Sequence, residues 1–198
     1  MLIYLMRHGE TDWNVLRRMQ GRSDIPLNAN GLSQARDAAN EMADIPFDRI
    51  FSSPLTRARQ TAAAVARGRE LTVTVEPLLI EMGFGDLEGV PRFEYPEQCE
   101  VIFTDPERYV PVGGGETYQA LDLRCQALLE EFIPALEGQC QTVLMCSHGG
   151  FIKGVVRRLK GRPLRDFWID PPQANCARTL LECEQGRVRL IQEGAFLH

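Results

Sequence analysis

The chain has 198 residues, of which 44% are apolar and 25% are charged, and these values suit one soluble domain with a sizeable core. Its formal net charge of -5 argues against a nucleic-acid or anionic-membrane partner, since both favour a basic face. No apolar run approaches the roughly 18 residues of a membrane span, no signal-peptide pattern opens the chain, and the cysteines lack zinc-ligand spacing. We therefore expect a cytoplasmic protein with reduced cysteines in its core.

Three short apolar runs predict strands, over residues 2–6, 49–51 and 142–146. They are too short for helices, and continuous apolar character is typical of strands that are buried on both faces of a sheet. Near the end of the chain, residues 179–183 and 187–191 flank Glu-Gln-Gly, a pattern that predicts a hairpin at the sheet edge.

Helical periodicity follows each of the three runs. The apolar positions are Leu32, Ala35, Ala39 and Met42 after the first run, Leu55, Ala58, Ala62 and Val65 after the second, and Phe151, Ile152, Val155, Val156 and Leu159 after the third. A longer helix is predicted from the stripe Tyr118, Leu121, Cys125, Leu128, Phe132 and Leu136. Strands that alternate with helices predict an α/β fold with three layers, in which a mostly parallel sheet carries helices on both faces. We expect residues 1–198 to form a single domain, with the irregular stretch 83–115 as a lid-like insertion.

Polar residues follow the predicted strands at the point where each strand ends. Arg7 and His8 follow the first, His148 follows the last, and Arg57 lies a few residues beyond the second. Ligands of open α/β sheets bind at the carboxyl ends of the strands, so these four side chains are expected to meet in one pocket. Other arginines (Arg17, Arg18, Arg22 and Arg59) lack this placement, and we expect them at the surface. His198, at the chain end, is expected to be solvated.

Four blocks of sequence contain these residues in order. They are Arg7-His8-Gly9-Glu10-Thr11 with Asn14, the stretch 52–62 that includes Arg57, the stretch 81–89 that begins with Glu81, and Ser147-His148-Gly149-Gly150. Together the blocks resemble the signature of the histidine phosphatase superfamily, the phosphoglycerate-mutase-like proteins. The resemblance covers the chain from residue 1 to about residue 160. It implies an enzyme of that fold in which a histidine is phosphorylated transiently.

The resemblance assigns the nucleophile to His8 and the phosphate contacts to Arg7, Arg57 and His148. The chemistry agrees with each assignment. Neutral imidazole is present near pH 7, and a hydrogen bond from its second nitrogen would fix the tautomer. Arginine forks match phosphate oxygens bidentately, and His148 would donate to the charge that spreads over the phosphoryl oxygens in the transition state.

Further residues receive roles through the same blocks. Glu81 matches the acidic residue of the family, and we expect it to protonate the leaving alkoxide and then to activate water. Gly149 and Gly150 open the helix after the last strand, so free amides there would favour the same anion. Asn14 is expected either to donate to phosphate or to cap a helix. Glu88 is expected to be structural. No metal ligand set and no cofactor are expected, because the predicted phosphate shell consists of arginine and histidine.

The stretch 83–115 is the basis for choosing between phosphatase and mutase. It has two basic residues, Arg92 and Arg108, against seven acidic ones: Asp86, Glu88, Glu94, Glu97, Glu100, Asp105 and Glu107. This balance suits an acceptor with a second anionic group poorly, so we expect a phosphomonoesterase that acts on a small-molecule phosphate ester. The third block is similar to alpha-ribazole phosphatases and broad-specificity bacterial phosphatases, which implies alpha-ribazole phosphate or a sugar phosphate as substrate. The alternatives are a cofactor-dependent phosphoglycerate mutase and an inactive, protein-binding member. The sequence leaves the oligomeric state open, with a homodimer as one option.

Overall fold

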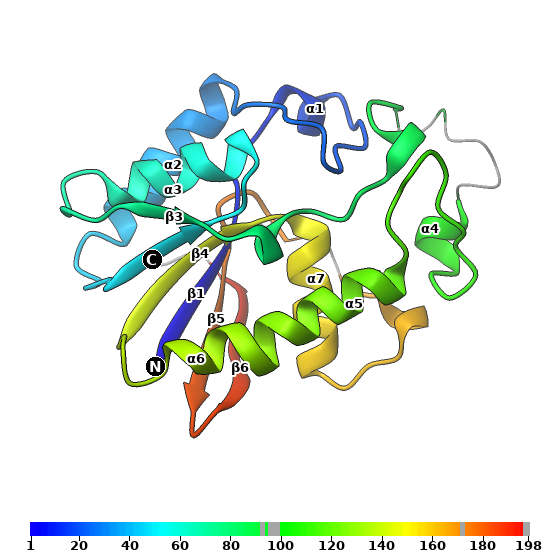
Figure 1. Cartoon of the computed structure of the whole chain (residues 1–198). Coiled ribbons are helices and arrows are strands. Elements are labelled where there is room, and N and C mark those ends of the chain that lie inside the picture. Colours follow the sequence, from blue (N-terminus) through cyan, green and yellow to red (C-terminus); the bar gives the residue numbers. More distant parts are fainter. Residues whose placement is uncertain (92–93, 95–99, 171–172, 196–198) are drawn as a thin grey trace.

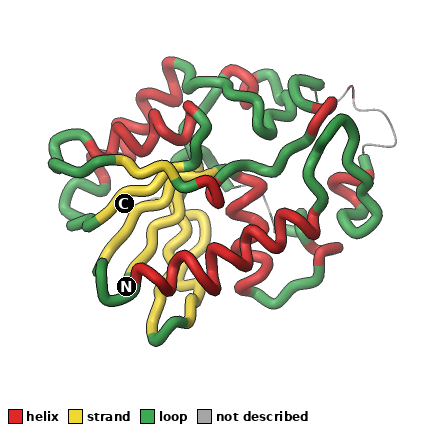
Figure 2. The backbone as a smooth tube through the Cα atoms, in the orientation of Figure 1, coloured by secondary structure: helices red, strands yellow, loops and turns green. Residues whose placement is uncertain are grey.

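The computed structural model describes residues 1–91, 94, 100–170 and 173–195. Within these residues one six-stranded sheet has helices on both faces (Figures 1 and 2), as the sequence predicts. The strands are β1 (Leu2–Arg7), β2 (Arg49–Ser52), β3 (Val73–Val75), β4 (Thr142–Ser147), β5 (Arg178–Glu184) and β6 (Arg187–Ala195). Their order is β3-β2-β4-β1-β5-β6; the pairs among the first four are parallel, while β5 and β6 are antiparallel to their neighbours.

The helices lie between the strands in sequence. They are α1 (Asp12–Val15), α2 (Ala29–Glu41), α3 (Thr56–Ala66), α4 (Val101–Thr104), α5 (Tyr118–Ala127), α6 (Ile133–Leu136) and α7 (Gly149–Leu159). A π-helical stretch over Leu128–Phe132 joins α5 to α6, so the long helix predicted from the apolar stripe continues to Leu136. Short 3-10 turns occupy Pro77–Leu79, Gly85–Leu87 and Leu164–Asp166. No helix among these residues combines the length and apolar character needed to cross a membrane.

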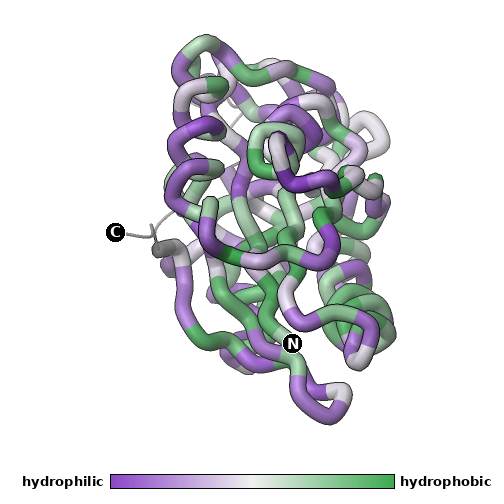
Figure 3. The backbone as a smooth tube through the Cα atoms, turned by 90° about the vertical axis from the view of Figure 1, so that its left-hand side faces the viewer, coloured by the Kyte–Doolittle hydropathy of each residue, from purple (hydrophilic) through white to green (hydrophobic). Residues whose placement is uncertain are grey.

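Alternate residues of the central strands enter two separate cores. Ile3 and Leu5 of β1 pack in the core under α5 and α7, whereas Met6 packs in the core under α2 and α3. Every residue of β4 is buried, as expected for a strand with parallel neighbours and covered faces. Figure 3 shows hydrophobic segments in the central part of the molecule and hydrophilic ones on outer turns. The predicted three-layer arrangement is therefore confirmed.

One predicted core position is wrong. Leu32 of α2 is 40% exposed, and Gly31 and Ala38 are buried in its place, together with the predicted Ala35. The reason is close packing of the helix against the segment after β1, because a Cβ at Gly31 would lie 2.0 Å from the Glu10 carbonyl oxygen. The first turn of α2 thus places its glycine, and not its leucine, against the segment after β1.

The predicted hairpin is present at one edge of the sheet as β5 and β6. Its turn residues Gln185 and Gly186 both have positive φ, 52° and 74°, as a two-residue hairpin turn requires. Part of the stretch 83–115 lies outside the described residues, and its role as a lid stays a prediction.

Candidate active site

The register of the sheet brings the ends of three parallel strands together. Arg7 at the end of β1 pairs with Ser147 at the end of β4, and Ser52 of β2 pairs with Cys146 of β4. The next residues along the chain are His8, Ser53 and His148. The rings of His8 and His148 have centroids 5.1 Å apart although 140 positions separate them in sequence. The topology thus assembles one site from segments that are distant along the chain.

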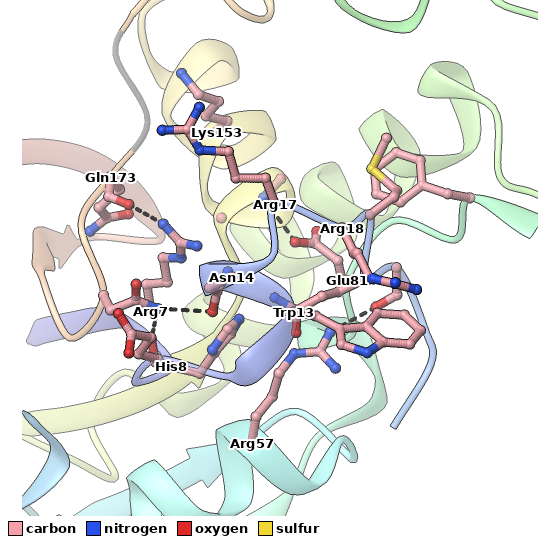
Figure 4. A pocket seen from close by; sticks show the side chains of 18 of the residues that line it. Arg7, His8, Trp13, Asn14, Arg17, Arg18, Arg57, Glu81, Lys153 and Gln173 are labelled. Carbon is pink, nitrogen blue, oxygen red and sulfur yellow. Dashed lines mark hydrogen bonds between the residues drawn. The ribbon is translucent and has the colours of Figure 1, made fainter. Parts of the chain in front are cut away.

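A cavity of about 650 Å³ opens at this edge of the sheet, within the size range of small-molecule sites. Among the residues that line it are six of the sequence-predicted ones: Arg7, His8, Asn14, Arg57, Glu81 and Gly149 (Figure 4). His148 is fully buried and does not line the cavity. It stands behind the wall, in contact with Arg57 and His8.

His8 is held as a neutral imidazole. It is 3% exposed, and its Nδ1 lies 2.7 Å from the Gly9 carbonyl oxygen. A carbonyl only accepts, so Nδ1 carries the proton and Nε2 keeps its lone pair. Burial, followed by the charges of Arg57 and Arg7, holds the pKa of His8 well below its usual range. The arrangement therefore presents an unprotonated nitrogen at neutral pH.

His148 belongs to a chain of hydrogen bonds behind the cavity. Arg57 Nε donates to His148 Nδ1 at 3.2 Å, so the proton of this neutral ring is on Nε2. That Nε2–H donates to Ser53 Oγ at 2.7 Å. Burial is the main cause that lowers the pKa of His148, and the charge of Arg57 adds to it. His148 is thus a neutral donor whose orientation depends on Arg57 and Ser53.

Both arginines are cations with donors left for an anion, Arg57 fully buried and Arg7 partly buried. Arg57 is fully buried, and its Nη1 and Nη2 each donate one hydrogen bond of 2.7 Å, to the carbonyls of Ser23 and Gly21. Burial lowers its pKa to about 10, which keeps it charged at neutral pH. Arg7 donates through Nη1 to the Gln173 carbonyl, while its buried Nε has no hydrogen-bond partner among the described residues. A buried unpaired guanidinium donor at a cavity wall is suited to an anionic ligand.

Glu81 occupies the N-terminus of α7. Its Oε1 accepts from the amides of Met82 at 2.8 Å and Phe151 at 2.9 Å, and its Oε2 accepts from Gly150 at 3.0 Å. The expectation that free amides of this helix bind the substrate anion is therefore wrong for Gly150, because a carboxylate of the protein already neutralises that helix end. Gly149 still lines the cavity, packed close to Arg7. The contacts fix Glu81 beside the arginines.

Asn14 has the capping role of the two that the sequence left open, and it also lies at the cavity. It forms a capping box with Thr11 at the start of α1, in which its Oδ1 accepts from the Thr11 amide at 3.1 Å. Its side chain also lines the cavity. Because Oδ1 is engaged in the cap, the Nδ2 amide group is the part left to donate to a ligand.

Glu88 is structural, as predicted. Its two oxygens accept from the amides of Arg22, Ser23 and Phe84 at 2.8, 2.7 and 3.0 Å. These bonds hold the loop whose carbonyls receive Arg57.

Arg17 and Arg18 are exposed, as the sequence predicts, and both also line the cavity, which the sequence did not indicate. Trp13, Lys153 and Trp168 line it as well. In contrast, Phe84 is the only described residue of the stretch 83–115 in the lining. None of its six described acidic residues lines the cavity, so the acidic character of that stretch does not set the charge of the described wall.

Ser53 was given no role by the sequence analysis. The sequence did contain an indication of a site residue there, because Ser53 directly follows a strand, as His8 and His148 do.

The described residues contain no group of three or more His, Cys, Asp or Glu side chains arranged to hold a metal ion.

Comparison with known proteins identifies relatives over almost the whole chain. The family model described as the histidine phosphatase superfamily (branch 1) matches residues 3–194. The adenosylcobalamin/alpha-ribazole phosphatase of Salmonella typhimurium is 34% identical over 190 residues, which cover 93% of this chain and 92% of that protein. Among solved structures, Bacillus stearothermophilus YhfR has a TM-score of 0.90 at 31% identity, covering 98% of this chain and 97% of its own. The mycobacterial glucosyl-3-phosphoglycerate phosphatase Rv2419c, in complex with VO3, has a TM-score of 0.86 at 28% identity, covering 98% and 99%.

Proposed function

Because the chain belongs to the histidine phosphatase superfamily and is a phosphomonoesterase, we propose that it hydrolyses small-molecule phosphate esters through a phosphohistidine at His8, without a metal ion. The observation that carries this proposal is the state of His8. Its Nδ1–H is committed to the Gly9 carbonyl, and its Nε2 is free of protons beside the buried Arg57 and the partly buried Arg7. Such a nitrogen is a competent nucleophile at neutral pH.

In the first step, Arg7 and Arg57 bind the phosphoryl oxygens, with Asn14 and the amide of Gly149 as further donors. The Nε2 lone pair of His8 attacks phosphorus, a P–N bond forms, and the P–O bond to the alcohol breaks. His148 acts from behind the wall, where its hydrogen bond with Arg57 orients that guanidinium while its own Nε2–H donates to Ser53 Oγ. The positive shell stabilises the charge that spreads over the phosphoryl oxygens.

Glu81 is the proposed proton carrier for both steps. Its Oε1 accepts two backbone hydrogen bonds, whereas its Oε2 accepts one, which leaves a lone pair on Oε2 for a proton. The protonated carboxyl gives this proton to the leaving alkoxide. The resulting carboxylate then takes a proton from water, the hydroxide attacks phosphorus, the P–N bond breaks, and inorganic phosphate leaves with His8 restored.

The substrate proposed from the relatives is alpha-ribazole phosphate or a sugar phosphate. The proposed setting is the cytoplasm, which agrees with five buried cysteines that are free thiols: Cys125, Cys140, Cys146, Cys176 and Cys183. The net charge of -5 supports the proposal that neither nucleic acid nor a membrane is a partner, and a homodimer stays an option.

Phosphate release from a panel of esters tests the proposed function. The panel includes alpha-ribazole phosphate, sugar phosphates and 3-phosphoglycerate with a trace of 2,3-bisphosphoglycerate. We expect free phosphate as the main product from the wild type and from the control variant Arg67→Gln, whose exposed side chain lies at the far end of α3. His8→Ala should release none. An excess of 2-phosphoglycerate over free phosphate would make the protein a mutase, and no turnover of any ester would support the inactive alternative.

A further inference from the structure

The cavity extends well beyond the space that a phosphoryl group needs. The proposed phosphoryl site is formed by Arg7, His8 and Arg57, and Arg17 and Lys153 line another part of the same cavity. We propose that Arg17 and Lys153 bind a second anionic group on the alcohol of the substrate. This proposal rests on the proposed function, because it assumes that the phosphoryl group occupies the proposed phosphoryl site.

The charges of the lining leave cations in excess after the phosphoryl group is accounted for. The lining holds five cations (Arg7, Arg17, Arg18, Arg57 and Lys153) and two carboxylates (Glu10 and Glu81). Both carboxylates already accept hydrogen bonds, Glu81 from the amides at the start of α7 and Glu10 from Asn28 and Asn30 at 3.0 Å each. A cavity of one charge sign attracts ligands of the opposite sign.

The Arg17 side chain has no polar partner among the described residues. It is exposed, and it makes no hydrogen bond, ion pair or ring contact with any described residue. Its backbone is left-handed, with φ at 52°, where the chain leaves α1 and the Arg18 amide bonds the Trp13 carbonyl at 2.9 Å. This position favours glycine, so an arginine there costs conformational free energy. Its guanidinium nevertheless lies over the cavity (Figure 4).

Lys153 is fixed in the same part of the cavity. It comes from α7, one turn after Gly149 and Gly150, and its Nζ donates to the Asp170 carbonyl while lying 5.6 Å from the centre of the Trp168 ring. In the view of Figure 4 the Arg17 and Lys153 side chains extend to the same side of Arg7, away from His8 and Arg57. Two cations of different chain segments therefore face the region that the alcohol part of the ester would occupy.

Arg18 does not belong to this pair. Its Nη1 donates to the Gly89 carbonyl at 3.0 Å, and Figure 4 shows it across the cavity from Lys153. The preferred substrate is then a phosphate ester whose alcohol carries a carboxylate or a second phosphate. This class differs from alpha-ribazole phosphate and from the uncharged alcohols that the acidic stretch 83–115 would favour, so among the proposed substrates it selects sugar phosphates with a second anionic group.

Binding to the turnover-deficient variant His8→Ala tests the proposal apart from catalysis. Glycerol 3-phosphate and 3-phosphoglycerate differ only in a hydroxymethyl group against a carboxylate, and fructose 6-phosphate and fructose 1,6-bisphosphate differ by one phosphate. By titration calorimetry we expect the ligand with the extra anion to bind about tenfold more tightly in at least one pair, as one partly desolvated ion pair would give. The pair that shows the preference identifies the anion.

Adding Arg17→Gly to this variant should remove most of the preference, and Lys153→Gln should reduce it. Glycine suits the left-handed backbone, so the melting temperature should stay equal or rise, which excludes misfolding as the cause. Arg67→Gln, which removes an exposed charge outside the cavity, should leave the preference unchanged. Equal binding within both pairs, binding of no ligand, or a preference that survives Arg17→Gly would overturn the proposal. Release of phosphate from glycerol 3-phosphate by the wild type is the separate test of the proposed function, so the two can fail independently.

Discussion

The neutral state of His8 has a consequence for stability that can be measured without a substrate. The folded protein holds the pKa of His8 well below the ordinary value of 6.5, mainly through burial. Below pH 6.5 the unfolded chain binds a proton at this position and the folded chain does not. The free energy of unfolding must then decrease as the pH falls through 6.5, until the pH reaches the folded pKa.

The magnitude follows from the linkage relation. Each pH unit below the unfolded pKa lowers the free energy of unfolding by about 1.4 kcal/mol for each group that stays neutral in the fold, so a His8 that is still neutral at pH 5 lowers it by about 2 kcal/mol. His148, whose pKa is also held well below 6.5, acts in the same direction. The change His8→Asn removes one of these groups while it keeps an amide donor for the Gly9 carbonyl.

Urea unfolding at pH 7 and pH 5, followed by tryptophan fluorescence, measures the effect. Between these pH values His8→Asn should lose about 2 kcal/mol less stability than the wild type, because carboxylates titrate alike in both proteins and cancel in the comparison. His198→Asn is the control, since the sequence predicts a solvated side chain, and it should behave as the wild type does. An identical pH dependence of wild type and His8→Asn would mean that folded His8 accepts a proton at pH 5, and it would refute a constitutively neutral nucleophile.

Three further predictions concern the surroundings of His8. Excess EDTA should leave phosphate release unchanged, because the proposed phosphate shell consists of protein cations; loss of activity that a divalent ion restores would contradict this. Ser53→Ala should lower the free energy of unfolding by about 1–3 kcal/mol, measured in urea, because the buried His148 Nε2–H loses its acceptor, and an unchanged stability would show that the bond is not formed. Gly150→Ala places a Cβ 2.7 Å from Glu81 Oε1, so steady-state kinetics should show kcat reduced about tenfold or more as the carboxylate moves; an unchanged kcat would remove Glu81 from the mechanism.

The sequence predicted the sheet well because its central strands are short and apolar on both faces. Residues 2–6 and 142–146 became β1 and β4, the paired strands at the centre, and the residues after them came together at one edge. The short strand β3 was not predicted. Two of its three residues, Thr74 and Val75, are exposed, so burial left no pattern in the sequence there.

The parts of the site that sequence analysis missed depend on packing between distant segments. Glu81 was recognised from its block, but its contact with the amides of Gly150 and Phe151 requires the position of α7 relative to residue 81. Arg17 follows a helix of only four residues, α1, and nothing in the sequence indicates that this helix stands beside the cavity. Periodicity identifies elements, whereas these contacts are set by how the loops between them fold over the sheet.

The central claim is that His8 carries the phosphoryl group between the two steps, and trapping that group tests it most directly. Wild-type protein mixed with an ester labelled in its phosphate is denatured with alkali within the first turnover, digested and sequenced. The account predicts label on the peptide that contains His8, stable in alkali and lost in acid, and no label in His8→Ala. Label on a cysteine or carboxylate, or label that persists in His8→Ala, would contradict it.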